Sequence, residues 1–372
     1  MAFVMPFDLM SPPSSRVVDD LAKTGRAAAG RAGSRGVAVW LFVLAGMILV
    51  MVSLGGATRL TGSGLSIMEW APIMGTLPPL SEAEWGRLYV LYQKIPQYGL
   101  INQGFGLDGF KGIFWLEWTH RLWGRLMGAV LFGPLVWFAV RGQISRGLAV
   151  RLGAVFLLGA AQGVVGWFMV SSGFQAESTA VSPYRLVVHL AMAVTLYVAV
   201  LWTALGVWRE ASGSVAGVAD RGLRRLAHSV AGMVVLTMLA GGFVAGLKAG
   251  LTYNTFPLMD GHLVPEGYGS IVPWWRNVFE NVAAVQFDHR VLATLTALVA
   301  TGTVVHGLRR RVARGQVLAL GGAVAAQYAL GVTTLLYVVP VGLGVAHQAV
   351  AMLVLTAALV LVYSLPKVPA AG

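Results

Sequence analysis

The chain has 372 residues, of which 57% are hydrophobic and 11% are charged, and its mean hydropathy is +0.72. Soluble domains carry about 25% charged residues, so this composition excludes an ordinary soluble globular protein. The chain contains no cysteine, which excludes disulfides, thiolate metal sites and iron–sulfur clusters. Its net charge of +12 therefore needs an explanation that suits a membrane protein.

Eight segments are long and apolar enough to cross a bilayer, which takes about 20 residues in a helix. They lie at residues 37–57, 115–140, 148–171, 184–207, 225–247, 283–307, 315–338 and 341–364. The long links are 58–114 and 248–282, and the other loops are short. The polar, basic residues 1–36 show no signal-peptide pattern, so we expect a cytoplasmic segment there. The sequence predicts an all-α membrane protein with eight transmembrane helices.

Most of the 27 Lys and Arg residues fall on one side of the membrane when the N-terminus is placed in the cytoplasm. The residues on that side are Arg16, Lys23, Arg26, Arg31, Arg35, Arg141, Arg146, Arg151, Arg209, Arg221, Arg224, Arg225, Arg309, Arg310, Arg311, Arg314 and Lys367. Because short cytoplasmic loops collect Lys and Arg, both termini are expected in the cytoplasm. Topology and contact with anionic lipid headgroups then explain the net charge, and binding to nucleic acid is not expected.

An internal repeat relates the two halves of the chain. Residues 55–66 match residues 241–252 without a gap, and matched helices share further motifs, including Gln162 with Gln327. Because each half has an even number of helices, both halves share one orientation, as in a parallel repeat about the membrane normal. We expect two four-helix bundles related by a pseudo-two-fold axis. The expected segments are the halves 37–207 and 225–364, the linker 208–224 and the tail 365–372.

Four of the seven histidines lie at matching repeat positions near the outer ends of predicted helices, namely His120, His189, His289 and His347. Ionisable side chains inside a membrane are costly and usually functional, and four matched positions favour ligands over structural residues. Two histidines from two helices of one bundle suit the axial positions of a haem. Zinc or non-haem iron would require more protein ligands. The remaining histidines lie at basic helix ends or in a loop: His228, His306 and His262.

The two predicted sites differ at one position. Glu117 lies three residues before His120, one turn away on the same helix face, and its counterpart in the second half is Gln286. A carboxylate can accept a proton and an amide cannot. We therefore predict that the N-terminal site carries out chemistry and that the C-terminal site stores or transfers electrons. The alternative is an interfacial Glu117 that only pairs with Arg121 or Arg125.

Two arginines directly follow candidate ligands, Arg121 after His120 and Arg290 after His289. They lie on the side of the membrane that is poor in Lys and Arg, so topology does not explain them. Haem propionates are carboxylates, which the planar fork of an arginine binds well. Arg121 and Arg290 are therefore candidates for propionate contacts.

Taken together, these motifs resemble the haem A synthase family. The resemblance spans about residues 37–364 and rests on residues 55–66, 117–121, 253–259, 286–290 and 347–348. It implies a haem b held by His289 and His347, a substrate haem o near His120 and His189, and an essential Glu117. Some members carry a cysteine pair in the first outer loop. This chain lacks it, as in the proteobacterial and mitochondrial branch, and a bacterial inner membrane with haem sites near the periplasmic face is expected.

The resemblance implies an enzyme that oxidises the C8 methyl group of haem o to a formyl group, giving haem a for terminal oxidases. Haem o synthase is the expected substrate donor, cytochrome oxidase assembly factors are the expected product acceptors, and the electron-transfer partner is unknown. The alternative is a diheme b-type membrane electron carrier, which leaves the difference between Glu117 and Gln286 unexplained. A repeat-built transporter would explain the repeat but not the four histidines.

Overall fold

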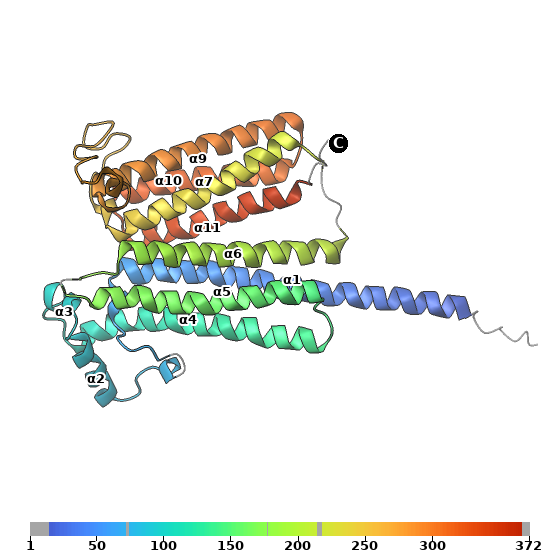
Figure 1. The fold of residues 1–372 in the computed structure, drawn as a ribbon, viewed down its shortest axis with the longest axis horizontal. Helices are drawn as coiled ribbons and strands as arrows, with labels where there is room; N and C mark the ends of the chain where they lie inside the picture. Colours follow the sequence, from blue (N-terminus) through green and yellow to red (C-terminus); the bar gives the residue numbers. More distant parts are fainter. Residues whose placement is uncertain (1–14, 72–73, 177, 214–217, 367–372) are drawn as a thin grey trace, which may run out of the picture.

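The computed structural model describes residues 15–71, 74–176, 178–213 and 218–366, with side chains described from Arg35 onward. Within these ranges eight helices are long and apolar enough to cross a membrane, which confirms the predicted number (Figure 1). They are α1 (Ser15–Leu60), α4 (Leu107–Val140), α5 (Arg146–Ser171), α6 (Pro183–Ser212), α7 (Arg221–Gly246), α9 (Val282–Arg310), α10 (Arg314–Leu336) and α11 (Val341–Ser364). The side chains of the predicted basic residues Arg16, Lys23, Arg26, Arg31 and Lys367 lie outside the described part.

Helix α4 begins earlier than predicted, at Leu107 instead of residue 115. Its first turns carry Asp108 and Lys111, which keeps them out of an apolar window. They are nevertheless helical, because Phe110 and Phe114 bury their rings against the connection between α1 and α4. The other predicted spans agree with the structure to within a few residues.

Short polar residues set the starts of several helices. Ser145, Asp220 and Asn281 each accept a hydrogen bond from a backbone N–H in the first turn of α5, α7 and α9. Pro183 stands in the first turn of α6, where its missing N–H removes no helical hydrogen bond. Gly213 ends α6 with a φ of 63°, a left-handed conformation that glycine adopts without steric cost. Local sequence therefore fixes these helix ends.

The long helices pack in two groups of four. In the first group, α1, α4, α5 and α6 form a ring in which each helix packs against two others, and α7, α9, α10 and α11 do the same. The groups meet where α1 packs on α11, α6 on α7, and α6 on α11. Figure 1 shows all eight helices nearly parallel. The buried core follows the central helices and includes Leu41, Ile48, Val200, Leu355 and Leu361.

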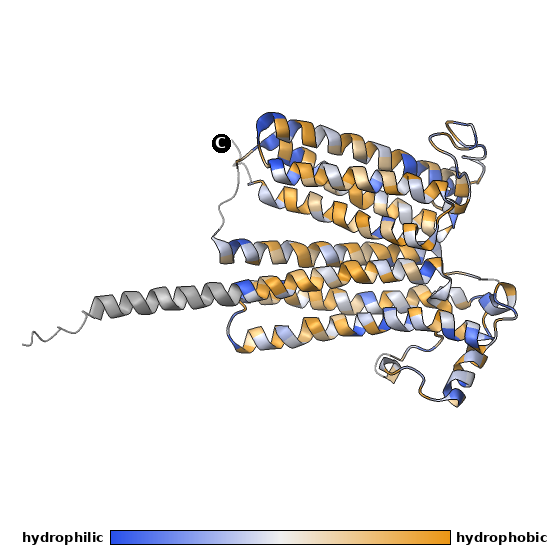
Figure 2. Cartoon of the chain, turned by 180° about the vertical axis from the view of Figure 1, so that it is seen from behind, coloured by the Kyte–Doolittle hydropathy of each residue, from blue (hydrophilic) through white to orange (hydrophobic). Residues whose placement is uncertain are grey.

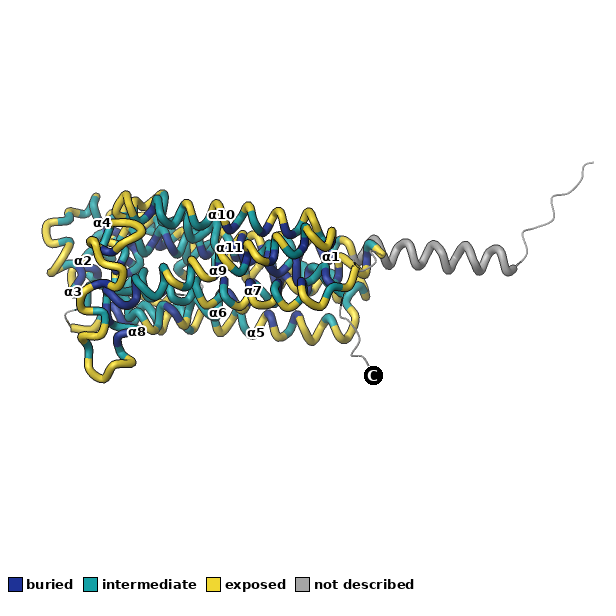
Figure 3. The backbone as a smooth tube through the Cα atoms, turned by 90° about the horizontal axis from the view of Figure 1, so that it is seen from above, coloured by how far each residue is buried: buried dark blue, intermediate teal, exposed yellow. Residues whose placement is uncertain are grey.

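The outer faces of the peripheral helices expose apolar side chains. Phe132 and Trp137 on α4 and Val150 and Leu157 on α5 are examples. Such a surface is stable in a bilayer, because lipid tails are as apolar as these side chains. Figure 2 shows apolar residues along the middle of the helices and hydrophilic residues gathered toward their ends, and Figure 3 shows exposed residues along their outer faces. The chain is a multi-pass membrane protein.

The two long connections lie at the same end of the molecule (Figure 1). The first contains η1 (Ser63–Leu65), η2 (Met74–Thr76), α2 (Glu82–Tyr92) and α3 (Pro96–Leu100), and the second contains η4 (Ala249–Leu251), η5 (Trp274–Arg276) and α8 (Asn277–Glu280). A further short helix, η3 (Ser172–Phe174), follows α5. In the first connection Trp85 and Tyr92 pack with Phe110 and Phe114 of α4. We call residues 61–106, which form this connection, the outer cap.

Candidate functional site

The four predicted histidines lie in two pairs, one pair in each helix group. His120 on α4 is within electrostatic range of His189 on α6, and His289 on α9 is within the same range of His347 on α11. All four side chains are half-buried. The fold therefore brings each pair together from two helices of one group, although the members of a pair are far apart in the sequence.

Each imidazole ring packs against a glycine on a neighbouring helix. The contacts are Gly55 with His120, Gly166 with His189, Gly241 with His289 and Gly331 with His347, and a Cβ atom at these glycines would lie 3.3, 3.0, 3.0 and 2.9 Å from the ring. At such distances a methyl group would have to displace the ring. Glycine at these positions lets the imidazole stand directly against a helix backbone, and a side chain there would push the ring away.

Three of the rings carry a buried nitrogen without a partner. The Nδ1 atoms of His189, His289 and His347 have no hydrogen bond to any described residue. Because the protein closes off these Nδ1 atoms, a ligand from outside the chain, such as a haem iron, would bind the other ring nitrogen, Nε2. In the described ranges no group of three or more His, Cys, Asp or Glu side chains could hold a metal ion. A haem iron needs only two axial ligands, and each histidine pair fits that requirement.

Glu117 is almost completely buried, with 2% of its surface exposed. Its Oε2 atom accepts hydrogen bonds from the hydroxyl of Ser66 at 2.7 Å and from the backbone N–H of Ile67 at 2.8 Å. Its Oε1 atom accepts from Nε of Arg121 at 3.0 Å and from Nη2 at 2.5 Å. The pairing with Arg121 is the contact that the alternative interpretation anticipated, and the carboxylate that makes it is buried in the protein. The carboxylate thus accepts four hydrogen bonds, and no acceptor group faces it among the described residues.

Gln286 occupies the corresponding place in the second group and is also 2% exposed. Its Nε2 atom donates to the backbone carbonyls of Ala249 and Thr252, each at 2.6 Å. Its Oε1 atom accepts from Nη2 of Arg290 at 2.7 Å. The surroundings of the two side chains are therefore inverted, because backbone acceptors face the amide whereas a hydroxyl and an N–H face the carboxylate. The difference between Glu117 and Gln286 is built into the fold around them.

The two arginines bind the backbone of the segments that follow α1 and α7. Arg121 donates to the carbonyls of Ile67 at 2.6 Å and Glu69 at 2.8 Å. Arg290 donates to the carbonyls at the matching positions 253 and 255, at 2.6 and 2.9 Å. These arginines therefore fasten an outer segment to the helix that carries a candidate ligand. Propionate binding by Arg121 and Arg290 stays a prediction, and it would have to coexist with these contacts.

Ser66 is a residue to which the sequence analysis assigned no role. It belongs to the repeated segment and aligns with Thr252, so a polar residue at this position was visible in both halves. The Thr252 hydroxyl donates to Ala249 within its own segment, whereas the Ser66 hydroxyl reaches Glu117. No sequence signal distinguishes these two uses, because they depend on the side chain that faces the segment from α4 or α9.

Ion pairs on the surface of the outer cap lie next to the segment whose Ser66 and Ile67 bind Glu117. Arg87 of α2 binds Glu69 at 2.8 Å and Glu84 at 2.8 Å. These hydrogen bonds from Arg87 lower the pKa of Glu69 and the pKa of Glu84 below the ordinary value of 4.5. Since the carbonyl of Glu69 also accepts from Arg121, the ion pairs of α2 connect to the environment of Glu117.

The fold defines a polytopic membrane protein, and its two histidine pairs are candidate haem sites. Comparison with known proteins agrees. Residues 38–359 match the model of the cytochrome oxidase assembly protein family, COX15-CtaA. The chain is 63% identical to a haem A synthase of Granulibacter bethesdensis over 330 residues, which cover 88% of this chain and 87% of the relative.

Two further relatives have the same description. A haem A synthase of Rhodospirillum centenum is 48% identical over 91% of this chain and 90% of its own length, and one of Nitrosospira multiformis is 45% identical over 87% and 91%. The chain belongs to the haem A synthase family, which confirms the resemblance found in the motifs.

Proposed function

We propose that this chain oxidises the C8 methyl group of haem o to a formyl group, giving haem a, at a site formed by His120, His189 and Glu117. As a haem A synthase it is an oxidoreductase with haem o as substrate. The observation that carries the placement is the buried position of the Glu117 carboxylate, which is surrounded by hydrogen-bond donors and lies one helical turn from His120. The second group has an amide there and no group at that position that could take up a proton.

In this proposal His120 and His189 hold the substrate and release the product. The small surfaces of Gly55 and Gly166 leave both rings free to stand against the helix backbone. Glu117 acts as a proton acceptor or relay, which takes up one proton at a time and passes it on as the methyl group is oxidised. Its hydrogen bonds from Ser66, Ile67 and Arg121 hold the carboxylate in one orientation.

His289 and His347 are proposed to hold a permanent haem b, which supplies a one-electron redox centre when bound. Their rings stand against Gly241 and Gly331, and both have an unpartnered buried Nδ1 atom. Gln286 and Arg290 fasten the adjacent outer segment without adding a carboxylate. This proposal assigns electron transfer to the second site, because Gln286 cannot take up a proton as Glu117 can.

The two groups are proposed to be related by a pseudo-two-fold axis along the membrane normal, with halves 37–207 and 225–364. In such a relation α1 corresponds to α7 and α6 to α11. The contact of α1 with α11 then corresponds to the contact of α7 with α6, and both contacts are present. The matched glycine–histidine contacts and the matched arginine–carbonyl contacts support the same relation.

The proposed location is a bacterial inner membrane, with both termini in the cytoplasm and both haem sites near the periplasmic face. The short connections at one end of the helices carry Arg141, Arg146, Arg311 and Arg314, which favours the cytoplasm for that end. Haem o synthase is the proposed substrate donor, and cytochrome oxidase assembly factors are the proposed acceptors of haem a.

The test is pyridine haemochrome and chromatographic analysis of the purified protein, produced with and without a supply of haem o. The proposal expects one retained haem b, together with substoichiometric haem o or haem a only when haem o is supplied. A diheme electron carrier would instead hold b-type haem in both sites under either condition. That result, with no haem a formed, would refute the proposed function.

A further inference from the structure

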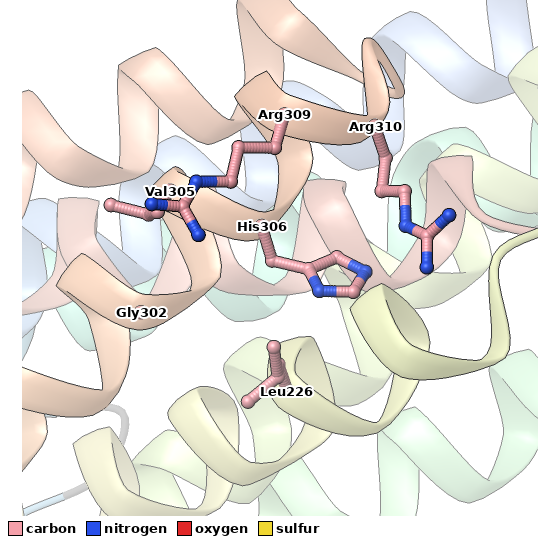
Figure 4. A pocket seen from close by; sticks show the side chains of 6 residues that line it. All are labelled: Leu226, Gly302, Val305, His306, Arg309 and Arg310. Carbon is pink, nitrogen blue, oxygen red and sulfur yellow. The ribbon is translucent and has the colours of Figure 1, made fainter.

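A basic pocket lies between α7 and α9, near the end of the helices opposite to the outer cap. Its volume is about 430 Å³. It is lined by Leu226 of α7 and by Gly302, Val305, His306, Arg309 and Arg310 of α9 (Figure 4). Figure 4 shows the His306 ring pointing from α9 toward α7, with the two arginines on either side of it. This pocket is separate from the four paired histidines.

The arginines of this pocket are available for an anion. Arg309 and Arg310 are exposed and make no hydrogen bond or ion pair with any described side chain. The nearest acid is Asp220, whose carboxylate accepts from the N–H of Leu223 at 2.7 Å and lies 3.1 Å from Nε2 of His306. These partners, and more weakly the charge of Arg310, lower the pKa of Asp220. The carboxylate of Asp220 is thus bound to the first turn of α7 and to His306. No described carboxylate lies within ion-pair distance of the guanidinium group of Arg309 or Arg310.

The depth of the pocket suits an amphiphile. Helix α9 has 29 residues and is therefore about 43 Å long, whereas the hydrocarbon core is about 30 Å thick. Its last turn, with both arginines, accordingly reaches the headgroup level. Gly302 lies about 12 Å further along the helix toward the hydrocarbon. The pocket is thus basic at the level of phosphate groups and apolar, next to Leu226 and Val305, at the level of acyl chains.

We propose that this pocket binds the phosphate group of an anionic phospholipid such as phosphatidylglycerol. The guanidinium groups of Arg309 and Arg310 bind the phosphate oxygens, and one acyl chain runs past Gly302 and Leu226. A Cβ atom at Gly302 would meet nothing within 4 Å, so the missing side chain leaves open space in the pocket. Basic residues at a helix C-terminus also follow from the helix dipole and from topology, but neither explains an open pocket beneath them.

The experiment measures binding of phosphatidylglycerol to the purified full-length chain by native mass spectrometry, after removal of endogenous lipid. Two variants alter the pocket in different ways. Arg309→Gln with Arg310→Gln removes the charge, and Gly302→Leu fills the space without changing charge. Arg311→Gln with Arg314→Gln is the matched charge control, because it also removes two charges and neither residue lines the pocket. Gly322→Leu on α10 is the matched control for added volume, since a Cβ there also meets nothing within 4 Å.

The proposal expects saturable binding of phosphatidylglycerol that is at least about tenfold tighter than binding of phosphatidylcholine. Both pocket variants should weaken it by about tenfold or more, and both controls should change it less than about twofold. Equal losses in the control pair Arg311→Gln with Arg314→Gln and in the pocket pair Arg309→Gln with Arg310→Gln would show a general charge effect and overturn the site. Unchanged binding in Gly302→Leu would overturn the acyl-chain path. Displacement of the lipid by inorganic phosphate at equal concentration would show a free-anion site instead of a lipid site.

Discussion

At the residue scale, the environment of Glu117 is what separates the two candidate sites. A carboxylate that accepts four hydrogen bonds is surrounded only by donors, and an amide at that place would turn an N–H group toward at least one of them. Gln286 is stable at the matching place because backbone carbonyls face it. The exchange of one residue type for the other therefore changes chemistry and local hydrogen bonding together.

Glu117→Gln is expected to abolish haem a production, with a loss of about 10²–10⁴-fold in turnover, and to leave haem b bound. The reason is the loss of the group that takes up protons next to the substrate. Haem a formed per folded protein is the measurement, with haem b content as the measure of folding. Turnover within a few fold of the native protein would show that Glu117 only fastens the outer segment.

Gln286→Glu is the matched variant in the second group. A carboxylate there would face the carbonyls of Ala249 and Thr252 without a donor to offer them. Lower thermal stability and weaker retention of haem b are expected, with haem a formation per haem b-loaded protein preserved. A strong loss of turnover in fully loaded Gln286→Glu protein would mean that both positions take part in the chemistry.

Ser66→Ala should lower haem a production by about tenfold while haem b stays bound, because a hydrogen bond to a charged group contributes about 1.5–3 kcal/mol. The variant leaves the carboxylate in place and removes one donor that orients it. Thr252→Ala is the control, since that hydroxyl binds its own segment and not Gln286. A shift in the pH profile of turnover would accompany the Ser66 effect if it acts through Glu117, and equal effects of both variants would argue against it.

At the scale of elements, the spacing between neighbouring helices is set by glycines that stand against the histidine rings. Gly166→Ala is expected to weaken retention of the substrate haem, and Gly331→Ala to weaken retention of haem b, because each new methyl group would push a ring from its place. Gly163→Ala on α5 is the control, as its Cβ would meet nothing within 4 Å. Haem content after purification is the measurement. Full haem retention in both variants would show that these glycines have no role in haem binding.

The outer cap should loosen in acid. The pKa of Glu69 and the pKa of Glu84 are lowered by Arg87, so their ion pairs are fully present above about pH 4.5 and are lost as the pH falls through the lowered values. The effect is modest, because exposed ion pairs contribute little to stability. Limited proteolysis with an acid-active protease should cut the cap a few fold faster in acid, and Arg87→Gln should remove most of this pH dependence. If the native cap is cleaved at the same rate above and below about pH 4.5, after correction for the activity of the protease itself, the role of these ion pairs is contradicted.

At the scale of the whole molecule, two helix groups of the same construction are expected to hold haems with different lifetimes. His289→Ala and His347→Ala should each remove or loosen the permanent haem b. His120→Ala and His189→Ala should instead abolish haem a production and leave the b-type spectrum largely intact. Absorption spectra and pigment analysis of the four variants decide the assignment. Loss of haem b in the His120 or His189 variant, with haem a production kept in the His289 and His347 variants, would reverse the assignment of the two sites.

The sequence by itself determined the membrane class, the eight spans and the four histidines. The length of the apolar segments and the placement of Lys and Arg are visible in the sequence, and a bilayer selects for both. The internal repeat is visible in the sequence as well. The start of α4 was the exception, because Asp108 and Lys111 hide a helical turn whose aromatic residues pack against the outer cap. That turn depends on contacts with residues distant in the chain.

Only the tertiary structure decided which groups surround each site residue. The sequence distinguished Glu117 from Gln286, but not the hydroxyl and N–H that face the carboxylate or the carbonyls that face the amide. It likewise left open the partners of Arg121, which are backbone carbonyls of the outer segment. Hydrogen-bond partners of a buried side chain come from whatever element packs against it, and the packing of a loop on a helix is a property of the folded chain alone.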